Sequence, residues 1–440
     1  MHQTNNPDAL LSRELGTRQL AATIFNYTVG SGIFVLPAFA VLQLGQAAPL
    51  AYVTCAIIIG LVVMCFAEAG SRVSATGGPY AYVETALGPF VGFVAGCLVL
   101  ATGTSAAGAV ASVVARSILS LAPNAPVWVT PAFILLLVSM LVAINYRGVK
   151  TGASVIEAIT VAKLLPLLAF VGIGVFFIEP SNLAWEAVPD MSAVLGTAGI
   201  VIFAFSGIEG SLIPSGEVKN PAKTVPRAAF LAHGAATLLY LAIQFVALGI
   251  LGTDLANDRT TPLASAAAAI AGPTARTILV VGAVISMFGY LSANVLSEPR
   301  GLFAFSRDGF LPKVFSSVHP SFHTPHVAIM TYGVLVAAIA LSGTYETLAV
   351  FANLSALMLY FLCAIAAYVL RKRDVRTDGE PFLAPGGALV PVAACLSLAW
   401  LFYETVTLKQ FLWLVGVLVL IFVLYGARAL RRRRAVLRTA

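Results

Sequence analysis

Long apolar segments separated by short polar connections run along almost the whole chain. An α-helix needs about 20 predominantly apolar residues to cross the hydrocarbon core of a membrane. The sequence supplies segments of this kind at residues 18–44, 48–69, 85–120, 128–147, 152–178, 193–217, 226–252, 274–300, 326–343, 346–370, 387–404 and 409–428. The pattern therefore predicts an all-α membrane protein with twelve transmembrane helices.

The composition agrees with this pattern and excludes several function classes. Hydrophobic residues make up 59% of the 440 residues and charged residues only 10%, which lies outside the range of soluble proteins. Sequence motifs for an ATP-binding loop, a zinc protease and a serine hydrolase are absent. We expect no cofactor, no metal site and no enzymatic activity.

The basic residues predict the orientation in the membrane. With the N-terminus placed in the cytosol, most of the 26 Lys and Arg residues fall in the termini and in the connections on the cytosolic side. The positive-inside rule then predicts that both termini are cytosolic. The polar residues 1–20 predict no cleavable signal peptide. The net charge of +7 includes four consecutive arginine residues at 431–434, which suit an anionic lipid surface. The positive charge therefore does not require a nucleic acid, and none is expected as a partner.

Two glycine-containing stretches interrupt the apolar segments. They read VGSGIF at 29–34, in the first predicted helix, and FSGIEG at 205–210, in the sixth. Four uninterrupted predicted helices follow each of these two, and the final pair of helices comes after the second set. Unwound backbone is tolerated at membrane depth only where it lines a cavity or is buried in protein. Paired interruptions in two topologically inverted halves are typical of a transporter's binding site. The alternative is that these glycines allow close packing of helices.

Five stretches carry a resemblance to a known family. They are NYTVGSGIFVLP (26–37), FAEAGSRVSATGGPYAYVETALG (66–88), NYRGVKTGASVIEAITVAKLLPL (145–167), FAFSGIEGSLIPSGEVKNPAKTVPRA (203–228) and EPRGLFAFSRDGFLPKVFSSVHP (298–320). In this order the sequence resembles the permeases of the amino acid–polyamine–organocation (APC) superfamily, in particular bacterial amino acid transporters.

The resemblance implies a LeuT-type fold and a location in the inner (cytoplasmic) membrane. In that fold, two inverted repeats of five helices occupy residues 17–180 and 181–372, and two additional helices occupy residues 386–428. A cytosolic tail at 1–16 and a basic cytosolic tail at 429–440 complete the expected organisation.

The resemblance also implies that a small zwitterion binds at the two breaks. The N–H groups that follow Gly30 suit a carboxylate, and the carbonyl groups near Thr28 suit an ammonium group. Carbonyl groups around Ser206 can supply further contacts. The candidate substrate-binding residues are Thr28, Val29, Gly30, Ser31, Gly32, Ile33, Phe203, Phe205, Ser206, Gly207 and Ile208.

Two ionisable residues within the predicted helices are candidates for proton coupling, because burying a charge is costly. Glu209 is interpreted either as a proton-responsive group or as a structural acceptor for backbone N–H groups. Lys163 lies nine residues beyond Ser154, too deep for its side chain to reach the headgroups. The resemblance implies that its amine takes the place of a sodium ion between the first, fifth and eighth helices. A permanently charged strut is the alternative.

Other charged residues are expected at the cytosolic surface. Glu217 and Lys219 are expected to form an inner gate or to cap a loop. Glu68 and Arg72 are interpreted as a solvated pair at the cytosolic edge.

The predicted function is secondary active transport of an amino acid by alternating access, with proton coupling and without sodium. Membrane lipids surround the protein and protons are the expected coupling ion. The aromatic lining, with Phe203 and a candidate contact from Tyr290, favours a neutral or hydrophobic substrate. Glu209 leaves open an exchanger or uptake system for a cationic amino acid or polyamine. A membrane nutrient sensor on the same scaffold is the alternative from another class.

Overall fold

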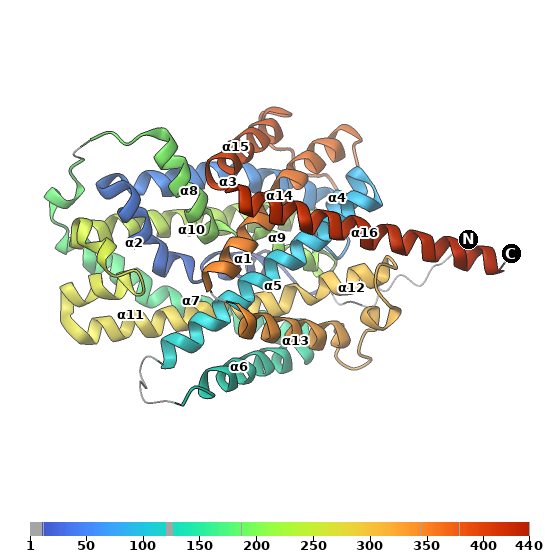
Figure 1. Cartoon of the computed structure of the whole chain (residues 1–440), viewed down its shortest axis with the longest axis horizontal. Helices are drawn as coiled ribbons and strands as arrows, with labels where there is room; N and C mark the ends of the chain where they lie inside the picture. The colour runs from blue at the N-terminus through green and yellow to red at the C-terminus, as the bar shows by residue number, and fades with distance from the viewer. Residues whose placement is uncertain are drawn as a thin grey trace.

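The structure is a computed structural model that describes residues 11, 13–119, 126–185, 187–343, 345–377 and 379–439. Within these residues the regular structure is helical, apart from one isolated bridge between Leu15 and Val218 (Figure 1). Most of the predicted tail at 1–16 and the last residue of the tail at 429–440 lie outside the described residues.

The α-helices follow one another with short connections, and several of them begin at a proline, which suits the first turn because it needs no N–H there. In chain order they are α1 (Thr17–Thr28), α2 (Gly32–Leu44), α3 (Pro49–Arg72), α4 (Pro79–Leu87), α5 (Pro89–Leu119), α6 (Val129–Tyr146), α7 (Val149–Gly174), α8 (Met191–Phe205), α9 (Ile208–Ser211), α10 (Pro221–Leu251), α11 (Pro262–Ser297), α12 (Pro299–Arg307), α13 (His326–Ser342), α14 (Tyr345–Lys372), α15 (Leu389–Thr405) and α16 (Leu408–Thr439).

Among the described residues, eight helical segments are long and apolar enough to cross a membrane, and each coincides with a predicted span. The bent pair α1 and α2, which changes direction by 44°, gives a ninth when it is counted as one span. Three shorter apolar helices coincide with the remaining predicted segments, at His326–Ser342, Leu389–Thr405 and Leu408–Val423. The predicted all-helical character is confirmed for the residues that the structure describes.

Several predicted boundaries are wrong for local reasons. The segment 85–120 is divided, because Gly88 adopts a φ of 91° and ends α4 before α5 begins. The segment 193–217 is not one continuous helix, because the second break interrupts it after Phe205 and helical structure resumes at Ile208. The segment 274–300 starts too late, since α11 already begins at Pro262 and continues past a kink at Gly272.

The helices pack around α5, which crosses the bundle obliquely (Figure 1). It packs against α14, α13 and α4, while α11 packs along α7 and α10 packs along α3 and α1. The α1–α2 break and the α8–α9 break meet inside this bundle, because α1 contacts α9 and α2 contacts α8. Burial of apolar side chains between these helices therefore places the two breaks against each other.

The end of the bundle that is expected to be cytosolic is tied together by buried ion pairs. Glu68 Oε1 accepts a hydrogen bond from Arg72 at 3.1 Å, and the two side chains are only 2% and 1% exposed. The expectation of a solvated pair is therefore wrong. The segment that follows α14 covers the pair, since Arg72 donates to the Val375 carbonyl and Glu68 accepts from the Ala384 N–H.

The segment after the second break is held to two other parts of the chain. Glu217 Oε1 accepts from Arg300 Nε at 2.6 Å, and both side chains are buried. Leu15 donates its N–H to the Glu217 carbonyl at 3.0 Å and accepts from the Lys219 N–H at 2.8 Å. The Lys219 side chain instead lies at the surface, 3.8 Å from Glu14.

Candidate functional site

The first break separates α1 from α2 at Val29, Gly30 and Ser31. The Thr28 carbonyl accepts hydrogen bonds from the Gly30 N–H and from the Tyr240 hydroxyl, both at 2.9 Å. The Tyr240 hydroxyl has one proton and lies 2.9 Å from the Ala204 carbonyl as well, so it is shared between the two breaks. The Thr28 carbonyl therefore keeps a lone pair for an ammonium group whenever Tyr240 donates to Ala204.

The side chain of Lys163, from α7, contacts the second carbonyl group of the break, which belongs to Val29. Its Nζ donates to the Val29 carbonyl at 2.8 Å, and Ser286 of α11 donates to the same oxygen at 2.9 Å. The Lys163 side chain is fully buried, and its Nζ lies 5.1 Å from the centre of the Phe25 ring. The Lys163 amine therefore lies at the carboxyl end of α1, where the helix dipole favours its protonated form.

The second break lies between α8 and α9, at Ser206 and Gly207. Gly207 has a φ of 141°, and a Cβ at this position would lie 2.8 Å from the Tyr27 carbonyl carbon. Both the backbone conformation and the close approach of α1 require glycine here. A Cβ on Gly32 would likewise lie 2.8 Å from the Ala204 Cα, so the two breaks are in direct contact.

Glu209 completes the second break from within its own segment. Its Oε2 accepts from the Gly207 N–H at 2.9 Å and from the Tyr360 hydroxyl at 2.7 Å. Glu209 is 2% exposed. The carboxylate thus caps an N–H group that the interrupted helix leaves without a carbonyl partner, and it connects α9 to α14.

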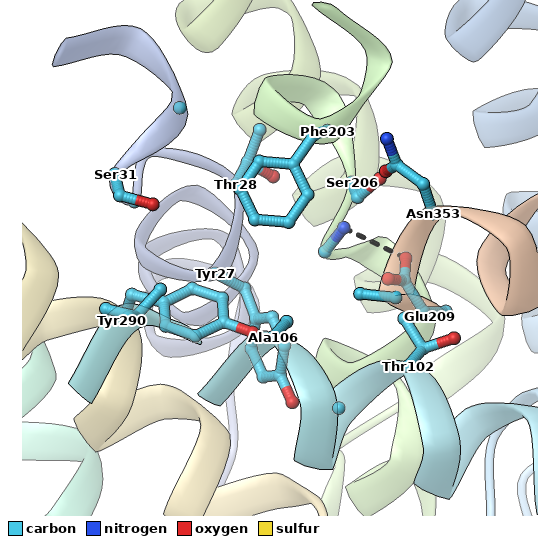
Figure 2. Close-up of a pocket in the computed structure, with 16 residues that line it drawn as sticks. Tyr27, Thr28, Ser31, Thr102, Ala106, Phe203, Ser206, Glu209, Tyr290 and Asn353 are labelled. Carbon is cyan, nitrogen blue, oxygen red and sulfur yellow. Dashed lines mark hydrogen bonds between the residues drawn. The ribbon is translucent and has the colours of Figure 1, made fainter. Parts of the chain in front are cut away.

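A cavity lies between the two breaks, α5, α11 and α14 (Figure 2). It leaves about 30 Å³ for the centres of water molecules, which is room for a few waters and not for an amino acid. The lining consists of Tyr27, Thr28, Gly30, Ser31, Gly32, Thr102, Gly103, Ala106, Val110, Phe203, Ser206, Gly207, Glu209, Tyr290, Ala352 and Asn353. In the view of Figure 2, Ser31 and Asn353 lie on opposite sides of the Phe203 ring.

Most of the predicted substrate-binding residues line this cavity, and four do not. Phe205 points away from the cavity. The centre of its ring lies 6.3 Å from that of Tyr52 and 5.0 Å from that of Tyr240. Val29 contributes its carbonyl group to the contact with Lys163. The two remaining residues, Ile33 and Ile208, are buried in the surrounding apolar core.

The cavity residues from α5 and α14 were not predicted, because the sequence does not reveal which face of these helices points inward. Two of them carry buried oxygens for which the described residues provide no hydrogen-bond partner, Thr102 Oγ1 and Asn353 Oδ1. The cavity residues Gly103, Ala106 and Val110 are spaced at helical intervals, but small residues recur all round α5 and do not single out this face.

A second cavity lies beyond Ser31, which lines both. It leaves about 40 Å³ for water centres and reaches the connection before α11 at Thr260 and Thr261. Asp258 fixes this connection by accepting hydrogen bonds from Thr260, Thr261 and Ser265. Burial raises the pKa of Asp258, but these hydrogen bonds outweigh it and hold the pKa well below its usual value.

Comparison with known proteins identifies relatives over almost the full length. The family model described as amino acid permease matches residues 15–428. The chain is 28% identical over 438 residues to the methylthioribose transporter of Bacillus subtilis (strain 168), covering 95% of this chain and 94% of that protein.

Two further relatives from the same organism are named for different substrates. The branched-chain amino acid permease BcaP is 28% identical over 436 residues, covering 94% of this chain and 93% of that protein. The serine/threonine exchanger SteT is 29% identical over 408 residues, covering 90% of each chain. Because the family model covers most of the chain, this multi-pass membrane protein belongs to the amino acid permease family of the APC superfamily.

Proposed function

We propose that the protein is a secondary active transporter, and not an enzyme, that moves a neutral or hydrophobic amino acid across the cytoplasmic membrane. The observation that carries the proposal is the meeting of two interrupted helices at one cavity. The N–H groups at the start of α2 are suited to the substrate carboxylate. The unpartnered oxygens of Thr102 and Asn353 are suited to its ammonium group.

The lining favours a neutral side chain. Among the lining residues the charged one is Glu209, and its Oε2 already accepts two hydrogen bonds. The remaining wall includes Ala106, Val110, Phe203 and Ala352, which suit apolar atoms of a substrate. The names of the relatives include a methylthio sugar, branched-chain amino acids and serine or threonine as substrates, so the family alone does not select among these substrates.

The proposed mechanism is alternating access in a fold of two inverted five-helix repeats with twelve crossings and cytosolic termini. The central cavity is too small for an amino acid, so movement of the wall must accompany substrate entry. The second cavity beyond Ser31 suits a route from outside. Lys163 and Glu209 are the proposed proton-coupling residues, with the Lys163 amine replacing sodium.

Uptake into liposomes that contain the purified protein tests this function. Radiolabelled leucine, serine, arginine, putrescine and methylthioribose serve as probes, after a thermal-stabilisation screen over the twenty amino acids. We expect uptake of a neutral amino acid that an inward proton gradient stimulates. Selective uptake of arginine or putrescine would replace the neutral substrate with a cationic one. Stabilisation without uptake of any probe would favour a sensor.

A further inference from the structure

A second buried carboxylate, Glu298, lies against the wall of the central cavity. It stands at the junction of α11 and α12 and is 1% exposed. A Cβ on Gly103, which lines the cavity, would overlap the Glu298 Cδ. The carboxyl group therefore occupies the space beside α5 that a side chain at position 103 would need.

The two oxygens of Glu298 have different surroundings. Its Oε1 accepts from the Tyr27 hydroxyl at 2.8 Å. Asn294 Nδ2 donates to the Tyr27 oxygen at 3.0 Å and to the Gly103 carbonyl at 3.1 Å, and Tyr332 donates to Asn294 Oδ1 at 2.8 Å. The other oxygen, Oε2, is buried and has no hydrogen-bond partner among the described residues.

No described side chain provides Glu298 with a cation. The titratable groups that face it are Tyr27 of α1, Tyr290 of α11, Tyr332 of α13 and Glu209 of α9. On the α5 side it meets the backbone of Gly103.

The nearest basic residue along the chain is Arg300, which pairs with Glu217 and keeps one buried nitrogen, Nη2, without a hydrogen-bond partner among the described residues. It donates to Glu217 and to the Leu296 carbonyl. A buried ionised carboxylate that lacks a cation and leaves one oxygen unpartnered is costly. Binding of a proton to Oε2 removes that cost.

We propose that Glu298 is a proton-binding site that controls the attachment of α1 to α11. In the ionised form, the charge-assisted hydrogen bond from Tyr27 holds the last turn of α1. A proton that reaches Oε2 through water in the cavity makes the acceptor neutral, and a neutral hydrogen bond is roughly half as strong. Tyr27 directly precedes Thr28, where α1 ends, so protonation loosens the half-helix that forms the first break. The proton then leaves to the cytosol when α1 moves.

This inference deepens the proposed function by adding a proton site distinct from Lys163 and Glu209. Glu298 stands two residues from the end of the predicted segment 274–300, where an acidic residue is ordinarily solvated. Its burial therefore becomes visible only once Gly103 and Tyr27 are seen to pack against it.

Infrared difference spectra of the full-length protein in liposomes, recorded between neutral and acidic pH, test protonation without any substrate. Glu298→Gln keeps the size of the side chain and an acceptor for Tyr27 but cannot take up a proton. We expect the carboxylic-acid band that forms on acidification to lose one component in Glu298→Gln. Glu209→Gln is the matched control, because it removes the other cavity carboxylate and leaves that component in place. An unchanged band in Glu298→Gln overturns the proposal.

Hydrogen–deuterium exchange of the α1 peptide tests the coupling to helix movement. In the wild type we expect the protection of α1 against exchange, relative to the intrinsic amide rate at each pH, to fall several-fold on acidification. Tyr27→Phe removes the hydrogen bond and retains the carboxyl group, so its α1 protection should be low at both pH values. A wild-type pH response of α1 in Glu298→Gln would overturn the control by Glu298. Both measurements remain decisive even if no probe is transported, so the two proposals fail separately.

Discussion

The two helix breaks are satisfied in opposite ways. At the first break, the carbonyl groups of Thr28 and Val29 receive donors from α7, α10 and α11, among them the Lys163 ammonium group. At the second break, the Gly207 N–H is capped by Glu209 from the same segment, only two residues away. One break depends on distant helices, and the other largely closes on itself.

This difference follows from the way charge is distributed around the cavity. The end of α1 exposes carbonyl oxygens and is matched by a cation, whereas the start of α9 exposes an N–H group and is matched by an anion, as helix termini favour. Movement of α1 relative to α7 must disturb the first arrangement. The second arrangement can move as a unit with α9.

The largest effect is expected from Gly207→Ala, at the contact between the breaks. A Cβ here meets the α1 backbone at 2.8 Å with φ at 141°, so we expect loss of uptake and a markedly lower melting temperature. The matched control is Gly234→Ala on α10, where nothing lies within 4 Å of the added Cβ. Near-normal uptake by Gly207→Ala would remove the breaks from the proposed site.

Removal of the cation should have the next largest effect. Lys163→Met retains an apolar stem but leaves the Val29 carbonyl with one donor fewer, and a hydrogen bond to a charged group is worth about 1.5–3 kcal/mol. We expect proton-driven accumulation to fall at least about tenfold, as that free energy implies. Accumulation that still responds fully to the proton gradient in Lys163→Met would show that this lysine is not a coupling group.

The second break should respond more mildly and in a different observable. Glu209→Gln keeps an oxygen for the Gly207 N–H, so we expect the protein to fold and to transport with a flattened pH dependence. Tyr360→Phe removes the second donor to Glu209 and serves as the partner variant. If the pH profile of Glu209→Gln overlays that of the wild type, Glu209 is a structural cap.

A smaller effect is expected at the cavity wall. Phe203 lines the cavity and is only partly buried, so Phe203→Ala should raise the KM a few-fold with little change in stability. Phe205→Ala is the contrasting variant, because that ring packs against Tyr52 and Tyr240 outside the cavity. It should lower the melting temperature more and the substrate affinity less. The reverse result would exchange the roles of the two rings.

The last prediction is that removal of sodium has no effect on uptake. Because the Lys163 ammonium group takes the position proposed for a cation at the first break, replacing sodium by an equal concentration of choline should leave wild-type uptake unchanged. Stimulation by sodium would contradict this role and would imply a separate ion site.

The sequence predicted the positions of the breaks because glycine runs within apolar segments are conspicuous. Thr28 ends α1 directly before the first predicted stretch, and Phe205 ends α8 at the first residue of the second. The sequence could not show that Phe205 points away from the cavity, since the unwound backbone at Ser206 has no helical period from which to derive a direction.

The sequence also could not predict which faces of α5 and α14 line the cavity. Both helices are apolar nearly all round, so Thr102 and Asn353 carry no periodic signal that separates a cavity wall from a helix contact. The buried pair of Glu68 and Arg72 was misread for a related reason. Its burial depends on the segment after α14, which is distant in sequence and polar in composition.

The bridge between Leu15 and Val218 has a consequence for the design of variants. The contact is made by main-chain groups, because Leu15 donates to the Glu217 carbonyl and accepts from the Lys219 N–H. Side-chain replacements at these positions therefore leave both hydrogen bonds available, whereas proline at position 15 removes the donor. A purification tag placed before residue 11 preserves the bridge, but a truncation that begins after Leu15 deletes it.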